Sequence, residues 1–237
     1  MPALLDVVAT PAHVAERLLR ALDDGVAALA PSTLAWEPWL CGLAARWLPG
    51  LGRASAEVER LTLAAAVRAV LPRYDAAFGE RADTVDAFAR SLEVLRTHGV
   101  SAEVLLAAQQ HTAADDVGTR ARLGLLAAVL DEHTARLDAL GLVASASLEG
   151  RIAEALEASL GAGQAPQEAA TRLRLWHLQS LPPTRVRLLL ALARQAGSVG
   201  GRVELQVACE PRRERLPLTL DRALAIEDAF DRQRSGA

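Results

Sequence analysis

Residues Arg172 to Cys209, RLRLWHLQSLPPTRVRLLLALARQAGSVGGRVELQVAC, decide the fold of this chain. The stretch predicts a strand, a turn marked by two prolines, a helix, a loop and a second strand. Strand–helix–strand units build parallel sheets, because parallel neighbours need a long crossover connection. We therefore expect a parallel sheet here, with any ligand site beyond the carboxyl ends of its strands.

The N-terminal residues predict a further strand and helix of the same kind. The run LLDVVA at Leu4–Ala9 is short, apolar and rich in valine. Thr10 then offers a helix N-cap and Pro11 a first helical residue. Apolar residues recur at helical spacing through Leu22, and Gly25 can end that helix. Both ends of the chain are therefore expected to supply the sheet.

The middle of the chain predicts helices almost throughout. We expect helical segments from Pro31 to Trp47, Ser55 to Leu71, Asp83 to His98, Ser101 to Gln110, Arg120 to Leu140 and Ser147 to Leu160. The predicted fold is mainly α with a small parallel α/β layer. Residues 1–30 and 167–237 form that layer, and residues 31–166 form a helical subdomain. This subdomain is inserted between the N-terminal strand–helix and the C-terminal strand–helix–strand.

Composition excludes several classes of chemistry. The 237 residues contain no lysine and no asparagine, and all 26 basic residues are arginine. A Schiff-base lysine and a phosphate-loop lysine are therefore excluded within this sequence. No apolar run approaches the roughly 18 to 20 residues that span a bilayer. Two isolated cysteines make no disulfide framework. We expect a cytoplasmic protein without a membrane partner.

Charge is distributed unevenly along the chain. Residues 1–170 hold 14 arginines and 22 acidic residues, a balance of −8, whereas residues 171–237 hold 12 arginines and 7 acidic residues, a balance of +5. Such asymmetry is typical of an anionic partner, although a solvated arginine face is the plainer interpretation. The candidate contacts to DNA are Arg185, Arg187, Arg194, Arg212, Arg213 and Arg215.

The histidines give no catalytic or metal-binding pattern. His111 and Asp115 stand four residues apart, but their segment is better interpreted as a loop in which Asp115 or Asp116 caps the next helix. His133, within Asp-Glu-His, has no HExxH or Cys/His spacing around it. His98 precedes Gly99 at a helix end, where a cation favours the helix dipole. We expect no metal, no cofactor and no catalytic residue.

Other candidate residues leave alternatives open. His177 is either a buried strand histidine or part of a site at the turn Gln179–Thr184, which lacks glycine, lysine and carboxylate. A weak enzyme would be centred there. Trp36, Trp39 and Trp47 either pack in the core or stack on bases. The cysteines, Cys41 and Cys209, are expected to be packing residues.

The order of these pieces resembles a known family. The segments that carry the resemblance are VVATPAHVAERLLRAL, TVDAFARSLEVLRTHGVSAEVLLAA, RLGLLAAVLDEHTARLDALGLVASASLEGRIAEAL and LRLWHLQSLPPTRVRLLLALA with RVELQVA. They are similar to the helicase-like part of AddB-type subunits, which belong to bacterial helicase–nuclease complexes for double-strand break repair. The resemblance covers most of the chain and rests on apolar and turn patterns.

The chain departs from this family at its catalytic motifs. The family's phosphate loop would precede Met1, and its PD-(D/E)XK nuclease domain would follow Ala237 and needs a lysine. The predicted strand before the turn ends at Gln179-Ser180 instead of the acidic residue that holds magnesium. No catalytic residue carries over. The resemblance thus implies a catalytically degenerate, helicase-like module without ATPase or nuclease activity.

Three hypotheses about function follow from the sequence. The first is a non-catalytic helicase-like module that binds single-stranded or duplex DNA, or serves as a scaffold beside helicase–nuclease subunits in DNA repair or recombination. The second is a helical protein–protein interaction module, supported by the acidic middle of the chain. The third is a truncated gene product without independent function, which would expose apolar surface.

Overall fold

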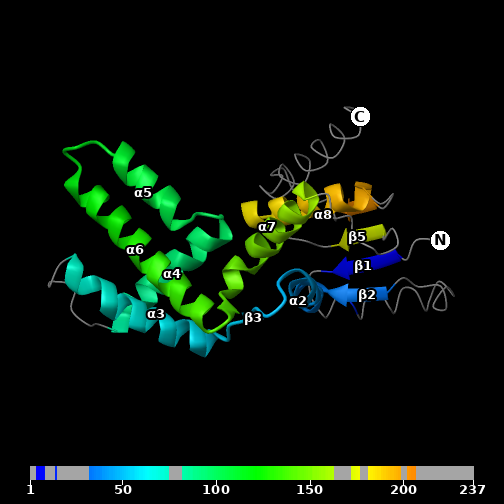
Figure 1. Ribbon diagram of the computed structural model, residues 1–237, viewed down its shortest axis with the longest axis horizontal. Helices are drawn as coiled ribbons and strands as arrows, with labels where there is room; N and C mark the ends of the chain where they lie inside the picture. Colours follow the sequence, from blue (N-terminus) through cyan, green and yellow to red (C-terminus); the bar gives the residue numbers. More distant parts are fainter. Residues whose placement is uncertain are drawn as a thin grey trace, which may run out of the picture. The chain divides into compact units, whose positions relative to one another are not determined.

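The computed structural model describes residues 4–8, 14, 32–74, 82–162, 172–176, 181–198 and 202–206 (Figure 1). By its internal contacts the chain divides into two compact units. The first, which we call the sheet unit, comprises Met1–Leu48 and Glu149–Ala237. The second, the helical unit, comprises Pro49–Leu148. The described residues are mainly helical with a few short parallel strands, so the predicted fold class is confirmed.

A four-stranded parallel sheet forms the core of the sheet unit. Its strands are β1 (Leu4–Val8), β2 (Ser32–Ala35), β5 (Arg172–Trp176) and β6 (Arg202–Gln206), in the order β2-β1-β5-β6. In register, Leu5 pairs with Leu173 and Leu173 pairs with Val203. Val7 and Val8 point to opposite faces, and both are fully buried. Burial on both faces explains why the sequence of β1, LLDVV, is apolar at four of its five positions.

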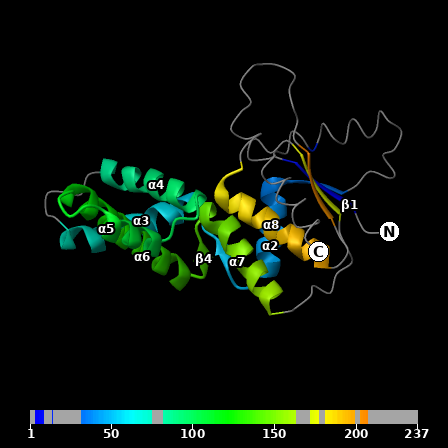
Figure 2. The same cartoon turned by 90° about the horizontal axis from the view of Figure 1, so that it is seen from above.

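Three helices of the described residues belong to the same unit as this sheet. They are α2 (Trp36–Trp47), α7 (Leu148–Gly161) and α8 (Pro183–Ser198), and Figure 2 shows them gathered beside the strands. Pro183 opens α8 at the position where a missing N–H costs nothing. The order β5, α8, β6 confirms the strand–helix–strand interpretation of Arg172–Cys209 over residues 172–206.

The start of the middle region was predicted wrongly. We expected a helix from Pro31, but Ser32–Ala35 forms β2, parallel to β1. The helix begins only at Trp36. Four residues are too few to show an alternating pattern, and the strand exists because β1 offers an edge to pair with. Sequence periodicity alone could not find that partner.

The unit boundaries also differ from those expected. We expected the inserted subdomain to span 31–166, whereas the helical unit spans Pro49–Leu148. Helices α2 and α7 both belong to the sheet unit, and both bury apolar side chains: Trp36 and Trp39 from α2, and Ile152 and Leu156 from α7. The expected linker, 161–166, lies mostly outside the described residues.

The helical unit is built from four longer helices. These are α3 (Ala56–Val70), α4 (Ala82–Thr97), α5 (Ala102–His111) and α6 (Val117–Ala139), with short turns η2 (Leu71–Arg73) and η3 (Ser145–Ser147). Two-residue strands β3 (Gly52–Arg53) and β4 (Leu142–Val143) pair in parallel. Helix α6 contacts α3, α4 and α5, and its Val129 and Leu130 are buried among them. The predicted helices are confirmed here to within a few residues.

Local sequence signals fix where these helices begin. The side chains of Ser55, Ser101 and Asp116 accept hydrogen bonds from backbone N–H groups of the first turns of α3, α5 and α6. In α6 the bond from Thr119 N to Asp116 Oδ1 is 2.9 Å long and lowers the pKa of that carboxyl group. The prediction that Asp115 or Asp116 caps α6 is confirmed for Asp116.

Glycines fix where two helices end. Gly99 after α4 and Gly141 after α6 have φ angles of 70° and 67°, in the left-handed region. Gly141 also carries the chain directly into β4, and its carbonyl oxygen accepts a hydrogen bond of 2.8 Å from Gly52 N. A Cβ atom at Gly141 would lie 3.4 Å from the carbonyl oxygen of Gly50.

We expect Gly141→Ala to lower the free energy of unfolding of the helical unit by about 1–2 kcal/mol, because alanine resists a positive φ. Gly118→Ala is the matched control in the same unit. Gly118 lies within α6 at ordinary φ and with only ordinary contacts, so alanine there should be neutral or stabilising by up to about 1 kcal/mol. Urea unfolding followed by circular dichroism measures both. Equal effects at the two sites would contradict this assignment.

Candidate functional site

Helix α8 carries three of the six arginines that the sequence proposed as DNA contacts. These are Arg185, Arg187 and Arg194. The other three, Arg212, Arg213 and Arg215, lie outside the described residues. The environment of the α8 arginines is therefore the first test of what this surface can do.

Arg185 is tied into the interior of the sheet unit. Its Nε and one terminal nitrogen donate to Glu149 Oε1 at 3.0 and 2.7 Å. Its guanidinium carbon lies 4.6 Å from the centre of the Trp36 ring, and Trp36 Nε1 donates to the same Glu149 oxygen at 3.1 Å. The side chains of Arg185 and Glu149 are only 21% and 11% exposed. Arg185 therefore joins α2, α7 and α8.

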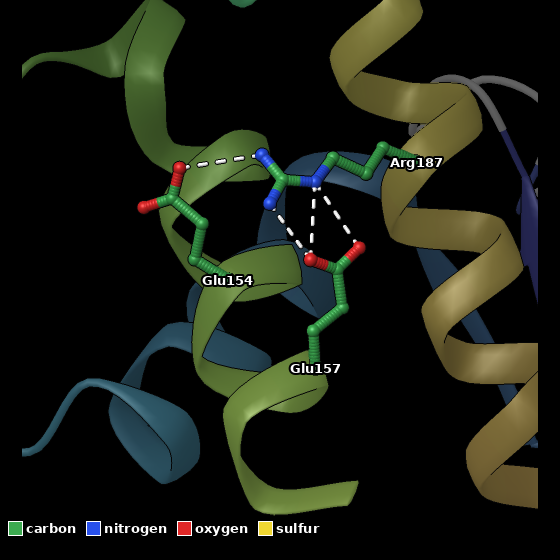
Figure 3. Close-up of polar contacts among 3 residues, drawn as sticks. All are labelled: Glu154, Glu157 and Arg187. Atoms are coloured by element: carbon green, nitrogen blue, oxygen red, sulfur yellow. Dashed lines mark hydrogen bonds and ion pairs between the residues drawn. The ribbon is translucent and has the colours of Figure 1, made fainter. Parts of the chain in front are cut away.

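Arg187 reaches across to two carboxylates of α7 (Figure 3). Its Nε lies 3.1 and 3.3 Å from the two oxygens of Glu157, and a terminal nitrogen donates to Glu157 at 2.7 Å. The other terminal nitrogen lies 3.3 Å from Glu154 Oε1. Hydrogen bonding from Arg187 lowers the pKa of Glu157, and the same bonds raise the pKa of Arg187.

Arg194 extends this charged surface along α8. It stands seven residues after Arg187, two helical turns on, and therefore on the same face. Its side chain is exposed, and its positive charge contributes to the lowered pKa of Glu157. We call Arg187 and Arg194 the arginine face of α8. DNA binding by these residues stays a prediction.

The acidic partners were absent from the sequence-based site. Glu149, Glu154 and Glu157 were assigned no role, yet they hold or oppose the α8 arginines. The signal was present as acidic residues at near-helical spacing in 148–161, followed by arginines in the next helix. Sequence alone gave no indication that these two helices face each other.

The tryptophans follow the packing alternative. Trp36 and Trp39 are buried, with ring centroids 5.0 Å apart, and Trp47 is half-buried with the Arg46 guanidinium 5.4 Å from its ring centre. Buried rings have no free face for a base. Cys41, which we expected to be a packing residue, is instead exposed on α2. The prediction that Cys41 packs in the interior was therefore wrong.

Two of the described histidines, His98 and His111, are exposed at helix ends. His111 ends α5 and is exposed, as is Asp115 in the following loop, so the loop interpretation of this segment is confirmed. His98 is exposed at the end of α4, with Nδ1 2.8 Å from the carbonyl oxygen of Val94. Within the described ranges, no three His, Cys, Asp or Glu residues gather as a metal site would require.

His133 is the exception, because it is buried in the helical unit. Only 2% of it is exposed, and its Nε2 lies 3.0 Å from Thr62 Oγ1. Thr62 Oγ1 donates to Val58 O, so we assign the histidine proton to Nε2. Burial and the nearby positive charge of Arg96 lower the pKa of His133 to about 4. A neutral histidine buried on α6 serves packing and hydrogen bonding.

The remaining sequence candidates fall mostly outside the described residues. His177, Gln179, Ser180 and Cys209 are not described. Of the turn at 179–184, Leu181, Pro182 and Thr184 are buried, and α8 already begins at Pro183. No helix of the described ranges is long and apolar enough to cross a bilayer. Comparison of the sequence with protein-family models and with curated proteins gave no match.

We expect Glu149→Ala to lower the free energy of unfolding of the sheet unit by about 3 kcal/mol. It would remove the carboxylate that accepts hydrogen bonds from the poorly exposed guanidinium of Arg185 and from the N–H of Trp36. Glu154→Ala, the control on the same helix, removes a half-exposed ion pair and should cost under about 1 kcal/mol. All four tryptophans lie in the sheet unit, so tryptophan fluorescence during urea unfolding reports on it. Similar losses for both variants would contradict the assignment.

Protonation of His133 should destabilise the helical unit in acid. Its pKa is about 4 in the folded protein and near 6.5 unfolded, so the unfolded state binds more protons between these values. Stability from neutral His133 is full above pH 6.5 and is lost as the pH falls toward 4, by up to roughly 3 kcal/mol.

Hydrogen exchange of α3 and α6 at several pH values measures this contribution. His133→Gln should be less stable than the wild type at pH 7, and the difference should narrow toward pH 4. His98→Gln is the control, because it retains His133 and its contact with Thr62. A constant difference for His133→Gln would show that titration of this histidine is not linked to folding.

Proposed function

We propose that this chain is a non-catalytic, helicase-like module that acts in DNA repair or recombination. The observation that carries the proposal is the connectivity. Strands β1 and β2 are separated from β5 and β6 by a compact helical unit, yet all four pair in one parallel sheet. A parallel sheet interrupted by a helical insertion is the arrangement that the resemblance to AddB-type subunits implies.

The charged residues support a binding role over a catalytic one. The α8 arginines face carboxylates and an aromatic ring, and no lysine occurs in the sequence to contact a nucleotide phosphate or to serve a PD-(D/E)XK nuclease centre. Residues 171–237 contain more arginines than acidic residues, and their positive charge would attract DNA phosphates whatever the base sequence. The partner class is therefore single-stranded or duplex DNA.

The contacts of the described α8 arginines suggest different roles for them within this proposal. Arg185 is a structural residue, because it is held by Glu149 and Trp36. Arg194 is exposed on α8 and is the described arginine best placed to meet a phosphate. Arg212, Arg213 and Arg215 remain candidates on the basis of their clustering in the sequence.

A protein–protein interaction module is the second candidate. Its support is a set of large apolar side chains exposed on the helical unit: Leu61 at 71%, Val117 at 68%, Val94 and Leu140 at 59%, Val104 at 52% and Leu106 at 43%. Exposed apolar residues are typical of binding surfaces where they adjoin, and a truncated gene product would also expose apolar surface. Co-purification of a protein partner that persists after nuclease treatment would favour this function.

DNA binding is tested by filter-binding titration with labelled single-stranded and duplex oligonucleotides in low salt. We expect measurable binding that weakens steeply with added salt. Arg194→Ala and the triple variant Arg212→Ala/Arg213→Ala/Arg215→Ala should weaken binding to all sequences, each lost phosphate contact lowering the salt slope by about one. Arg90→Ala, an exposed arginine of the helical unit, is the control and should bind like the wild type.

The result that contradicts a DNA role is an absence of binding to either oligonucleotide in low salt. Equal weakening by Arg90→Ala would instead show that binding reflects total charge and that the C-terminal arginines form no interface. Either outcome would favour a protein–protein interaction module as the function of this chain.

A further inference from the structure

One member of the arginine face of α8, Arg187, meets an acidic face of α7. Glu154 and Glu157 stand three residues apart and therefore project from the same side of their helix. Together they engage the Nε and both terminal nitrogens of Arg187 (Figure 3). The planar guanidinium thus meets paired oxygens, as it would on a phosphate group.

These contacts are weak enough to be exchanged. The side chains of Arg187, Glu154 and Glu157 are 45%, 55% and 32% exposed, so water and salt reach them. Exposed ion pairs of this kind add little to folding stability. The Arg185–Glu149 pair, by contrast, is shielded and holds α7 against α8 without any help from Arg187. Loss of the Arg187 contacts would leave the helices in place.

We propose that Glu154 and Glu157 mask Arg187 within the arginine face of α8, as an intramolecular substitute for nucleic-acid phosphate. The inference rests on the proposed DNA-binding function and adds its regulation. Phosphate must displace the α7 carboxylates before Arg187 contributes. Glu157 also interacts electrostatically with Arg194. Removal of the Glu157 charge would therefore strengthen the attraction of both Arg187 and Arg194 for phosphate.

The test compares the wild type with Glu154→Gln/Glu157→Gln, which keeps the side-chain shapes and removes two negative charges. We expect this variant to bind single-stranded DNA about three- to tenfold more tightly in low salt, with the gain shrinking as salt rises. Adding Arg187→Ala to it should abolish most of the gain. Unfolding followed by tryptophan fluorescence should show both variants folded, because the buried Glu149 contacts are untouched.

The matched control is Glu93→Gln/Glu103→Gln, which removes the same charge from exposed positions of α4 and α5 in the helical unit. It should bind DNA as the wild type does. If the wild type, Glu154→Gln/Glu157→Gln and the control bind equally, masking is wrong while DNA binding stands. If the control gains as much as the α7 variant, the effect is net charge and masking is again wrong. If none binds, the DNA-binding function itself fails and masking with it.

Discussion

The packing of α2, α7 and α8 in the sheet unit depends on hydrogen bonds to the carboxylate of Glu149. One of its oxygens accepts hydrogen bonds from Trp36 on α2 and from Arg185 on α8, while Glu149 itself belongs to the first turn of α7. These three helices come from distant parts of the sequence, 113 residues apart between Trp36 and Glu149. A poorly hydrated charge needs its partners, so the geometry of all three helices is coupled at this atom.

The position of Glu149 in the chain gives that interaction further consequence. The helical unit ends at Leu148, and the chain returns to the sheet unit at Glu149. The helix that follows leads toward β5, the strand that pairs with β1. An insertion of 100 residues, Pro49–Leu148, is therefore bounded on its return side by a residue that fastens the chain to α2 and α8. Sheet pairing and the Glu149 contacts together hold the two halves of the sheet unit.

The arginines of α8 differ in whether they are shielded within the fold or exposed to a ligand. A charge count over 171–237 treats all its arginines alike, yet Arg185 lies against a tryptophan ring and a poorly exposed carboxylate. Arg187 is paired in a more exposed position, and Arg194 is exposed. Only the contacts distinguish an arginine that builds the fold from one that can meet a ligand. The proposed masking by α7 follows from this gradation of exposure.

Local structure was predictable from the residues alone: the helices, their caps at Ser55, Ser101 and Asp116, the glycine ends, and the β5–α8–β6 unit. These depend on neighbours within a few residues and on apolar period, which a sequence displays. Three features became visible only in the folded chain: Ser32–Ala35 is a strand, α2 and α7 belong to the sheet unit, and Glu154 and Glu157 meet Arg187. Each of these requires a partner brought close by folding, and the residues carry no local sign of which partner that is.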